Sequence, residues 1–274
     1  MTKKYGILAY PAKYSLSPVM HYAAFNELGI DAEYGIFDVR EEDFQDFLEH
    51  ISENNIDGFS VSAPYKELIM HHINIIDEDA KNIGAVNTVL NKGGVLYGYN
   101  TDHIGAVHAL KTDISLLKLN EKKVVVLGAG GAARAICYGL LKEGAEVFIW
   151  NRTAEKAEQI ISDFKKVFGK KARISYVKDL ANLSGKFDIL IQATSIVGIK
   201  NLLPENFLEH FDFVMDIVYH PLVTPILEQA KKLGKKIITG ERMLLFQAVE
   251  QFKIWTEKEA PVRIMREALE KNLI

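Results

Sequence analysis

The sequence contains a single cysteine, Cys137, among its 274 residues. One cysteine cannot form an internal disulfide bond, and this usage is typical of proteins from a reducing compartment. Cys137 lies within an apolar helical pattern, so we expect a buried, unreactive thiol. The eight histidines form neither an HExxH motif nor a Cys/His ligand spacing. The sequence therefore predicts no disulfide and no metal site.

Long hydrophobic runs and an excess of positive charge are also lacking. No stretch reaches the roughly 18 to 20 apolar residues of a membrane-spanning helix, and the first segment, MTKKYGILAYPAKYS, holds too short an apolar run for a signal peptide. We therefore expect a cytoplasmic protein without a membrane partner. The net charge of −3 argues against nucleic acid as a partner, because phosphate binding needs a basic surface.

The first half of the sequence alternates short apolar runs with amphipathic stretches. Its pattern predicts strands over 5–10, 32–39 and 57–63, and helices over 17–29 and 41–53. In the first helix, Ser17 is expected as the N-cap, Pro18 in the first turn and Gly29 at the end. Strands that alternate with helices favour an α/β fold with a mostly parallel sheet.

A second α/β series begins near residue 122. The pattern predicts strands over 122–128, 145–150, 187–194 and 211–219, and helices over 128–144, 153–167, 241–256 and 260–272. The amphipathic segment 101–120 is expected to link the two series. The 274 residues are enough for two domains of ordinary size.

A glycine-rich turn joins the strand KKVVVLG to the helix that follows it. Gly128, Gly130 and Ala133 fit the GxGxxG/A pattern of dinucleotide-binding proteins. Gly128 allows the tight turn, and Gly130 allows the backbone to approach a pyrophosphate at the positive end of the helix. We therefore expect a dinucleotide on residues Gly128, Ala129, Gly130, Gly131 and Ala132. The alternative is a glycine turn used only for packing.

The end of the next strand indicates which dinucleotide binds. Sites for NAD usually place an acidic residue there, on the ribose 2′-hydroxyl. Here the strand ends in Asn151, Arg152 and Thr153, with an arginine and without an acid. Because a guanidinium binds a 2′-phosphate that a carboxylate would repel, the sequence favours NADP. Lys156, one helical turn further, either adds positive charge or is a solvated helix lysine.

Several segments, in this order, resemble the shikimate dehydrogenase family. They are YSLSPVMH, FSVSAPYK, GAVNTVLNKGGVLYGYNTDHIGA, NRT, DIVYHPLVTPIL and GERMLLFQAVEQF. The resemblance extends nearly from end to end. It implies a substrate-binding and catalytic domain over 1–102 and 241–274, a Rossmann domain over 103–240, and a cleft between them.

The resemblance implies that Lys66 and Asp102 are the catalytic pair. A ketone reduced by hydride becomes an alkoxide, which a positioned acid must protonate, and an ammonium group can supply that proton. Burial disfavours the charged form of a lysine, so its acidity can be tuned. Considered alone, Lys66 could be a solvated lysine on the first turn of a helix, and Asp102 a helix N-cap.

The remaining site residues follow from the same resemblance. Ser15 and Ser17 would bind the substrate carboxylate, near the N-terminus of a helix, and Ser17 could also be a cap. Ser62 stands where the family's TxPxK motif has threonine, so it keeps the hydroxyl and loses a methyl group. The other implied substrate contacts are Asn87, Tyr219 and Gln247; the other implied cofactor contacts are Thr194, Gly240 and Met243. Asn87 could instead be a structural turn residue, Gln247 could be exposed by its helical spacing, and Tyr219 and Met243 could be packing residues.

The sequence thus predicts an NADP-dependent enzyme that interconverts 3-dehydroshikimate and shikimate, in the chorismate route to aromatic amino acids. A relative that prefers quinate or uses NAD is one alternative. Arg152 argues against NAD, and the Ser15–Ser17 pair favours shikimate. A second alternative is a protein without catalytic activity that senses NADP or a metabolite. Lys66 and Asp102 argue against it. Monomer and homodimer both remain open.

Overall fold

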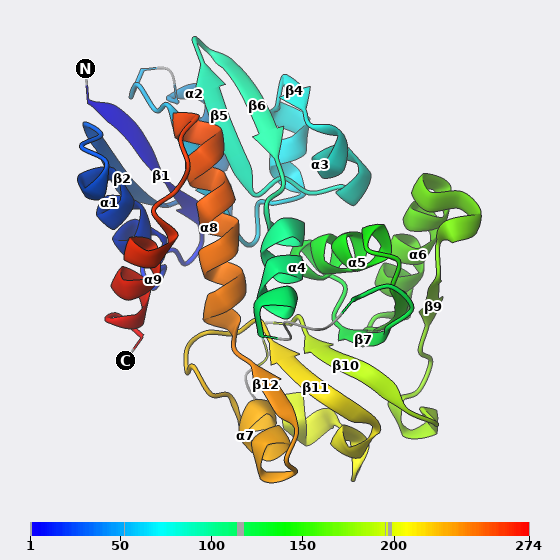
Figure 1. Cartoon of the computed structure of the whole chain (residues 1–274). Helices are drawn as coiled ribbons and strands as arrows, with labels where there is room; N and C mark the ends of the chain where they lie inside the picture. Colours follow the sequence, from blue (N-terminus) through cyan, green and yellow to red (C-terminus); the bar gives the residue numbers. More distant parts are fainter. Residues whose placement is uncertain (1, 52, 114–117, 195, 197–198, 274) are drawn as a thin grey trace. The chain divides into compact units, whose positions relative to one another are not determined.

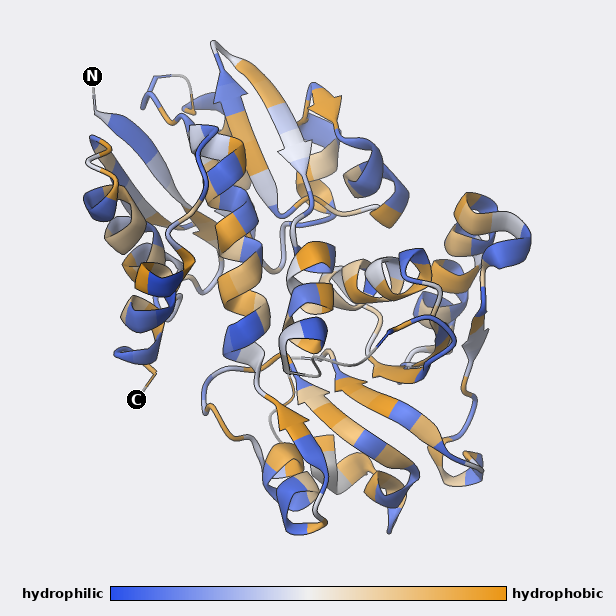
Figure 2. Ribbon diagram, in the orientation of Figure 1, coloured by the Kyte–Doolittle hydropathy of each residue, from blue (hydrophilic) through white to orange (hydrophobic). Residues whose placement is uncertain are grey.

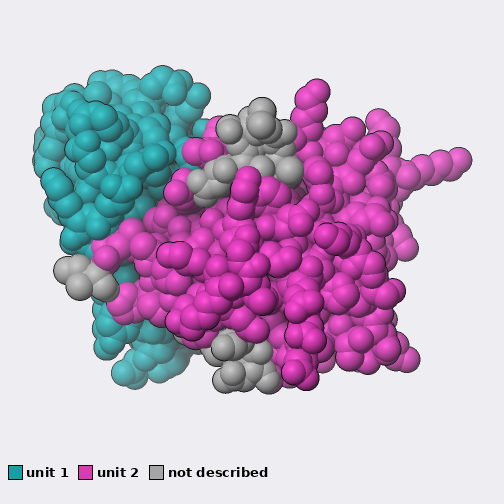
Figure 3. Space-filling model, turned by 60° about the horizontal axis from the view of Figure 1, so that its bottom comes forward, with its two compact units in different colours: residues 1–102, 244–272 teal, residues 103–243, 273–274 magenta. Residues whose placement is uncertain are grey.

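The structure is a computed structural model that describes the chain except residues 1, 52, 114–117, 195, 197–198 and 274. It divides into two compact units, which Figure 3 colours separately: residues 1–102 with 244–272, and residues 103–243 with 273–274. Each unit is built around one six-stranded sheet with helices. The predicted α/β class with mostly parallel sheets is confirmed.

The first unit contains strands β1 to β6 and most of the C-terminal helices (Figure 1). Its strands are β1 (Lys3–Ala9), β2 (Ala32–Asp38), β3 (Gly58–Val61), β4 (Ile75–Ile76), β5 (Thr88–Lys92) and β6 (Val95–Tyr99). Its α-helices are α1 (Ser17–Glu27), α2 (Phe44–Glu49), α3 (Glu78–Ile83), α9 (Val262–Glu270) and all but the first turn of α8 (Gly240–Thr256). Short 3₁₀ helices are η1 (Glu41–Asp43) and η2 (Leu68–His72).

Strand direction brings several loops of this unit to one edge of its sheet. The strand order is β2-β1-β3-β5-β6-β4, and only β5 runs against its neighbours. The ends of β1, β3 and β6 therefore lie at the same edge as the beginning of β5. Ser60 near the end of β3 pairs with Thr88 at the start of β5, which in turn pairs with Tyr99 at the end of β6.

Two local predictions in this unit are wrong. Helix α1 begins at Ser17, its N-cap is Leu16, and no side chain caps it. Instead, the Ser17 backbone N–H donates to the Ser15 hydroxyl at 3.2 Å. The predicted helix over 41–53 is shorter, because α2 ends at Glu49 and the chain then turns, burying Ile51 and Ile56 in the core.

The C-terminal helices pack on the first unit through aromatic side chains. The Trp255 indole N–H of α8 donates to the Val89 carbonyl of β5 at 2.9 Å. The Trp255 ring stacks on Tyr5 of β1 with centroids 5.1 Å apart, while α9 packs on α1. Glycine is required at Gly58 of β3, because a Cβ atom there would meet the Trp255 ring nitrogen at 2.8 Å. These contacts fix α8 against the middle of the sheet.

The second unit is a doubly wound Rossmann fold. Its strands are β7 (Lys123–Leu127), β8 (Glu146–Trp150), β9 (Ile174–Tyr176), β10 (Phe187–Gln192), β11 (Phe211–Asp216) and β12 (Lys236–Ile238). Its α-helices are α4 (Asp102–Asp113), α5 (Gly131–Lys142), α6 (Ala154–Phe168) and α7 (Pro225–Lys232). Its 3₁₀ helices are η3 (Gly169–Lys171), η4 (Leu180–Asn182), η5 (Ile199–Leu202) and η6 (Phe207–His210). The predicted linker 101–120 begins as α4, and its residues 114–117 lie outside the described residues.

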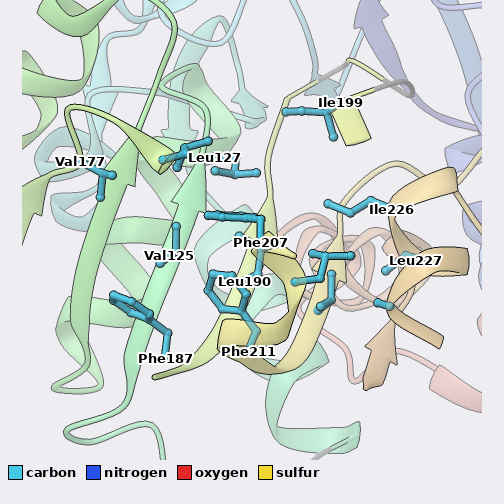
Figure 4. Close-up of a cluster of buried hydrophobic side chains, with 14 residues drawn as sticks. Val125, Leu127, Val177, Phe187, Leu190, Ile199, Phe207, Phe211, Ile226 and Leu227 are labelled. Atoms are coloured by element: carbon cyan, nitrogen blue, oxygen red, sulfur yellow. The ribbon is translucent and has the colours of Figure 1, made fainter. Parts of the chain in front are cut away.

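All six strands of the second sheet are parallel, in the order β12-β11-β10-β7-β8-β9. Counted from β7, this is the 3-2-1-4-5-6 order of dinucleotide-binding domains. Apolar residues dominate β10 and β11, as Figure 2 shows. Their side chains pack with η6 and α7 around Leu190, Phe207, Phe211 and Ile226 (Figure 4). The order reverses between β7 and β10, where doubly wound sheets bind their ligands.

A buried histidine is expected to make the first unit sensitive to acid. The His21 ring has no exposed surface and stacks on Tyr34 with centroids 4.6 Å apart. Burial lowers the pKa of His21 to about 3. Between about pH 6.5 and about pH 3 the unfolded chain therefore binds one more proton than the folded chain, and stability falls as the pH falls.

Replacement of His21 with phenylalanine should remove this sensitivity, since the ring is kept and the titrating group is lost. Between about pH 7 and about pH 5, the variant should lose about 2 kcal/mol less unfolding free energy than the wild type. Urea titrations at the two pH values measure the difference. An equal loss in both proteins would show that His21 does not carry the acid sensitivity.

Candidate active site

The turn after β3 places Lys66 at the edge of the first sheet where several loops meet. The chain leaves β3 at Val61, and the Ser62 N–H donates to the Leu8 carbonyl of β1 at 2.9 Å. Residues 63–67 form turns before η2 begins, so Lys66 does not lie on the first turn of a helix, which the alternative interpretation required. The Lys66 carbonyl accepts the Val86 N–H at 2.8 Å, which fixes the backbone at this position.

Lys66 and Asp102 form a largely buried ion pair. The Lys66 Nζ atom lies 2.5 Å from Asp102 Oδ2, and the two side chains are 18% and 6% exposed. The second carboxylate oxygen, Oδ1, accepts from Asn87 Nδ2 at 2.8 Å. An ammonium group has three protons, so this bond leaves Lys66 with others to offer to a bound oxygen atom. Helix α4 begins at Asp102. The carboxylate nevertheless bonds to the side chains of Lys66 and Asn87.

Asn87 lies just before β5 and orients the carboxylate of Asp102. Its Oδ1 atom accepts the Thr101 backbone N–H at 2.7 Å and the Thr88 hydroxyl at 2.8 Å. Because a backbone N–H can only donate, the amide orientation is fixed and Nδ2 must face Asp102. Its second N–H donates to Thr101 Oγ1 at 2.9 Å. A substrate hydroxyl would therefore have to share or displace one of these bonds.

The two serines predicted to bind a carboxylate lie together at the start of α1. Ser15 is half-buried, Ser17 is buried, and the Ser17 N–H bonds to the Ser15 hydroxyl. The loop that carries them follows β1 and is held by Asp38, whose carboxylate accepts the Ala12 N–H at 2.6 Å. Ser62 is half-buried and begins the turn that contains Lys66.

Helix α8 presents two glutamines on one face. Gln247 is buried, and its amide donates to the Leu244 carbonyl at 2.7 Å, within its own helix. Gln251, one turn later, donates to the Asn87 carbonyl at 3.2 Å and accepts from Ser60 at 2.9 Å. Because residues four apart share a helix face, Gln247 lies on the face that α8 turns toward the sheet. Sequence reasoning missed Gln251, since a glutamine in an amphipathic helix looks solvated.

In the second unit the glycine-rich turn follows β7 and leads into α5. Gly128 has a φ of 122°, and a Cβ atom there would meet the Ala193 carbonyl oxygen at 2.8 Å, so the protein itself requires glycine. Gly130 is different: its backbone is extended, it is the N-cap of α5, and a Cβ atom would meet nothing within 4 Å. Its open surface at a helix N-terminus fits the pyrophosphate of a dinucleotide.

Residues after β8 lie beside this turn, because the Gly128 N–H donates to the Trp150 carbonyl at 2.8 Å. Asn151 bonds across the loop to the Thr153 carbonyl at 2.9 Å, and Thr153 is the N-cap of α6. Arg152 and Lys156 are both exposed. An exposed guanidinium at the end of the second strand fits a 2′-phosphate, which must remain reachable from solvent.

Two buried polar side chains shape the loops after β10 and β11. Gln192 accepts the Thr194 N–H at 2.6 Å and donates to the Thr194 carbonyl at 3.0 Å, which folds that loop back on itself. Asp216 accepts the Val218 N–H at 2.9 Å and the Thr224 hydroxyl at 2.6 Å. Burial raises the pKa of Asp216 to about 6.

The loop between Val218 and Thr224 carries Tyr219, which is half-buried, and burial raises the pKa of its hydroxyl. Gly240 packs against the base of this loop, where a Cβ atom would meet the Ile217 carbonyl oxygen at 2.4 Å. Gly240 therefore has a packing role within this unit. Met243, in the first turn of α8, is buried.

In the described part of the chain, no three His, Cys, Asp or Glu side chains gather to hold a metal ion, and none of its helices has the length and apolar content needed to cross a membrane. Cys137 of α5 is buried as predicted, and burial raises the pKa of its thiol to about 12. This thiol is therefore protonated at neutral pH and a poor nucleophile.

Three family models match the chain in succession. They are "Shikimate dehydrogenase substrate binding domain" over residues 7–89, "Shikimate / quinate 5-dehydrogenase" over 110–209, and "Shikimate 5'-dehydrogenase C-terminal domain" over 240–270. The first covers Lys66 in the turn after β3 and Asn87 just before β5, and the second covers the glycine-rich turn and Arg152.

Individual relatives agree along almost the whole chain. The "Shikimate dehydrogenase (NADP(+))" of Pyrococcus furiosus is 42% identical and covers 97% of this chain and 94% of its own length. Its namesake from Aquifex aeolicus is 39% identical, with coverages of 96% and 94%. A crystal structure of shikimate 5-dehydrogenase from Thermus thermophilus in complex with NADP(H) and shikimate has a TM-score of 0.86, with 33% identity and coverages of 99% and 100%.

Proposed function

This chain belongs to the shikimate dehydrogenase family, and from that premise we propose that it is an NADP-dependent shikimate dehydrogenase. The reaction interconverts 3-dehydroshikimate and shikimate. The observation that carries the proposal is the Lys66–Asp102 ion pair, held by Asn87 at the edge of the first sheet. Its position, burial and partners suit a group that gives and takes a proton.

Lys66 is the proton carrier in this proposal. In the direction of reduction, bound NADPH would supply a hydride to the substrate carbonyl carbon, and the Lys66 ammonium would give a proton to the carbonyl oxygen. In the reverse direction neutral lysine takes that proton back. Asp102 keeps the lysine in place by accepting one N–H, and its negative charge stabilises the ammonium before the proton leaves.

The substrate's carboxylate is assigned to Ser15 and Ser17. Two adjacent hydroxyls at the beginning of α1 can donate to an anion, and the positive end of the helix adds to the attraction. Ser62 after β3, Asn87 before β5 and Gln247 of α8 complete the proposed substrate contacts of the first unit. Tyr219 is assigned to the substrate as well.

Bound NADP supplies or accepts the hydride, and the second unit is assigned to hold it. Gly130 and the N-terminus of α5 suit the pyrophosphate, because their surface is open and no part of the protein itself needs glycine at Gly130. Asn151, Arg152 and Thr153 are assigned to the adenosine ribose and its 2′-phosphate, with Lys156 nearby. Thr194, Gly240 and Met243 are assigned to the side that holds the nicotinamide.

Replacing Arg152 with alanine should separate the two nicotinamide cofactors. We expect KM for NADP to rise about 10- to 100-fold, since a charge-assisted bond to the 2′-phosphate is lost, while KM for NAD changes little. Steady-state kinetics with both cofactors measure the ratio. Arg173, which is paired with Glu146 in the same unit, gives a matched control as Arg173→Ala. Equal weakening of both cofactors would make Arg152 a structural residue.

Two other functions make different predictions. A relative that prefers quinate or NAD would use those compounds at least as well as shikimate and NADP, and one matching family model carries both substrate names. A sensor without catalytic activity would bind NADP and produce no reduced cofactor when shikimate is added. Tryptophan fluorescence for binding, together with absorbance of the reduced nicotinamide for turnover, distinguishes the sensor from the enzyme.

The proposed setting is the cytoplasm, on the pathway to chorismate and the aromatic amino acids. The single buried cysteine is consistent with a reducing compartment. Monomer and homodimer both fit the proposal.

A further inference from the structure

A chain of buried polar side chains lies behind the proposed catalytic pair and reaches across three strands. It joins Tyr34 of β2, Ser60 of β3, Gln251 of α8 and Asn87 before β5, and all four residues are less than 5% exposed. Tyr34 and Ser60 lie 2.6 Å apart at their oxygens, and Ser60 lies 2.9 Å from Gln251 Oε1. Gln251 Nε2 then lies 3.2 Å from the main-chain carbonyl oxygen of Asn87.

The direction of every hydrogen bond in this chain is determined. The main-chain carbonyl of Asn87 can only accept, so Gln251 must turn its NH₂ group toward it and its oxygen toward Ser60. Ser60 then uses its only proton on Gln251, and Tyr34 must donate to Ser60. The side chain of Asn87 is oriented in the same way by the Thr101 N–H, and it donates to Asp102. Gln251 thus bonds the main chain of Asn87, and the Asn87 side chain bonds the carboxylate that holds Lys66.

We propose that Gln251 is a positioning residue for the reaction, and that it acts by fixing Asn87 and, through Asn87, the Asp102 carboxylate that holds Lys66. This inference rests on the proposed function. One residue, Asn87, lies between Gln251 and Asp102, and both the oxygen and the nitrogen of the Gln251 side-chain amide are bonded to protein.

Trp255 provides an internal comparison, because it makes the same kind of bond from the same helix. Its N–H donates to the carbonyl of Val89, two residues further along the chain than Asn87. The Asn87 main-chain carbonyl also accepts the Val61 N–H at 2.7 Å, so Gln251 gives it a second hydrogen bond. Loss of either side-chain bond should therefore cost only about 0.5 to 1.5 kcal/mol of stability. Only the Gln251 bond ends on the residue that touches Asp102.

The test replaces Gln251 with methionine, which has similar length but cannot donate a hydrogen bond. We expect kcat for shikimate oxidation to fall about 10- to 100-fold, because a small misplacement of Asp102 and Lys66 slows the proton transfer. KM for NADP should stay unchanged. Gln251→Glu, which can still accept from Ser60 but as a carboxylate cannot donate to Asn87, should show the same loss and serves if the methionine variant does not fold.

Two controls separate positioning from simple loss of stability. Trp255→Phe should lower the thermal midpoint and leave kcat within about twofold of the wild type. In the Asn87→Ala background, Gln251→Met should have little further effect, because residues that act in series are not additive. Equal losses of kcat in Trp255→Phe and Gln251→Met, or full additivity with Asn87→Ala, would overturn the proposal.

A measurement without turnover keeps the proposal testable if the proposed function fails. The side-chain amide signals of Asn87 in ¹⁵N NMR can be assigned by their loss in Asn87→Ser. They should shift in Gln251→Met and stay in place in Trp255→Phe. Unmoved Asn87 signals in Gln251→Met would overturn the positioning role, whereas an inactive wild type with moved signals would overturn only the function.

Discussion

Replacing Lys66 with alanine should lower kcat for shikimate oxidation by about 10²- to 10⁴-fold, because the reacting hydroxyl loses its proton acceptor. The fold should survive, since Lys66 lies in a turn and its backbone bond from Val86 does not need the side chain. KM for NADP should change little. Stopped-flow or steady-state absorbance of the reduced nicotinamide gives the rate, and circular dichroism checks the fold.

The chain offers a matched control for this substitution. Lys122 and Asp188 form another lysine–aspartate pair in the second unit, with Nζ and Oδ1 2.7 Å apart. Lys122→Ala removes that pair and should leave turnover within about twofold of the wild type. A Lys66→Ala variant that keeps wild-type turnover would remove Lys66 from the mechanism and with it the proposed proton path.

Replacing Asp102 with asparagine should have a comparable effect, about 100-fold on kcat, although the two side chains have the same shape. The reason lies in Asn87, whose Nδ2 group donates to one carboxylate oxygen at 2.8 Å. The new asparagine must turn its own oxygen toward that donor. Its NH₂ group then faces the Lys66 ammonium, and two donors cannot bond to each other.

Asp102→Asn should therefore displace Lys66 rather than merely weaken the ion pair. Two measurements follow from this reasoning. The double variant with Lys66→Ala should be no slower than Lys66→Ala alone, because both substitutions remove the same function. KM for shikimate should rise in Asp102→Asn if the carboxylate also binds a substrate hydroxyl. A single variant with more than half of the wild-type kcat would contradict the pairing; Asp188→Asn is the control.

The sequence predicted the second unit well because its signals are local. A buried parallel strand is a nearly unbroken apolar run, and the turn after β7 needs glycine at Gly128 for backbone reasons alone. Both signals can be read without knowing what lies nearby in space. The identity of the cofactor also depended on adjacent residues, Asn151 and Arg152.

The first unit was harder to predict because its sheet contains the antiparallel strand β5. The hairpin from β5 to β6 was not predicted, although Gly93 and Gly94 have φ values of 62° and 89° and a Gly-Gly pair between two β-rich runs is a hairpin signal. This hairpin brings Asn87 and Asp102 to the edge that Lys66 occupies. The ion pair itself came from family resemblance, since the two residues are 36 positions apart.

Gln251 and Ser60 could not have been found from the sequence. Gln251 bonds to Asn87, 164 positions away, and to Ser60, 191 positions away, and the sequence shows neither pairing. In the sequence each looks like an ordinary polar residue of a helix or strand.

The role of Ser17 was predicted wrongly for a local reason. A serine before proline is typical of a helix cap, but here the helix begins one residue earlier than that pattern expects, and Leu16 takes the N-cap position.

The most direct test of the proposed function is the rate at which the purified protein reduces NADP or NAD with shikimate or quinate as substrate. The account predicts that kcat/KM is highest for shikimate with NADP and at least about 10-fold lower when either compound is exchanged, since the 2′-phosphate alone contributes a charge-assisted bond. Comparable rates with quinate or NAD would contradict the assigned specificity. No turnover with any of the four pairs would contradict the assignment of an enzyme.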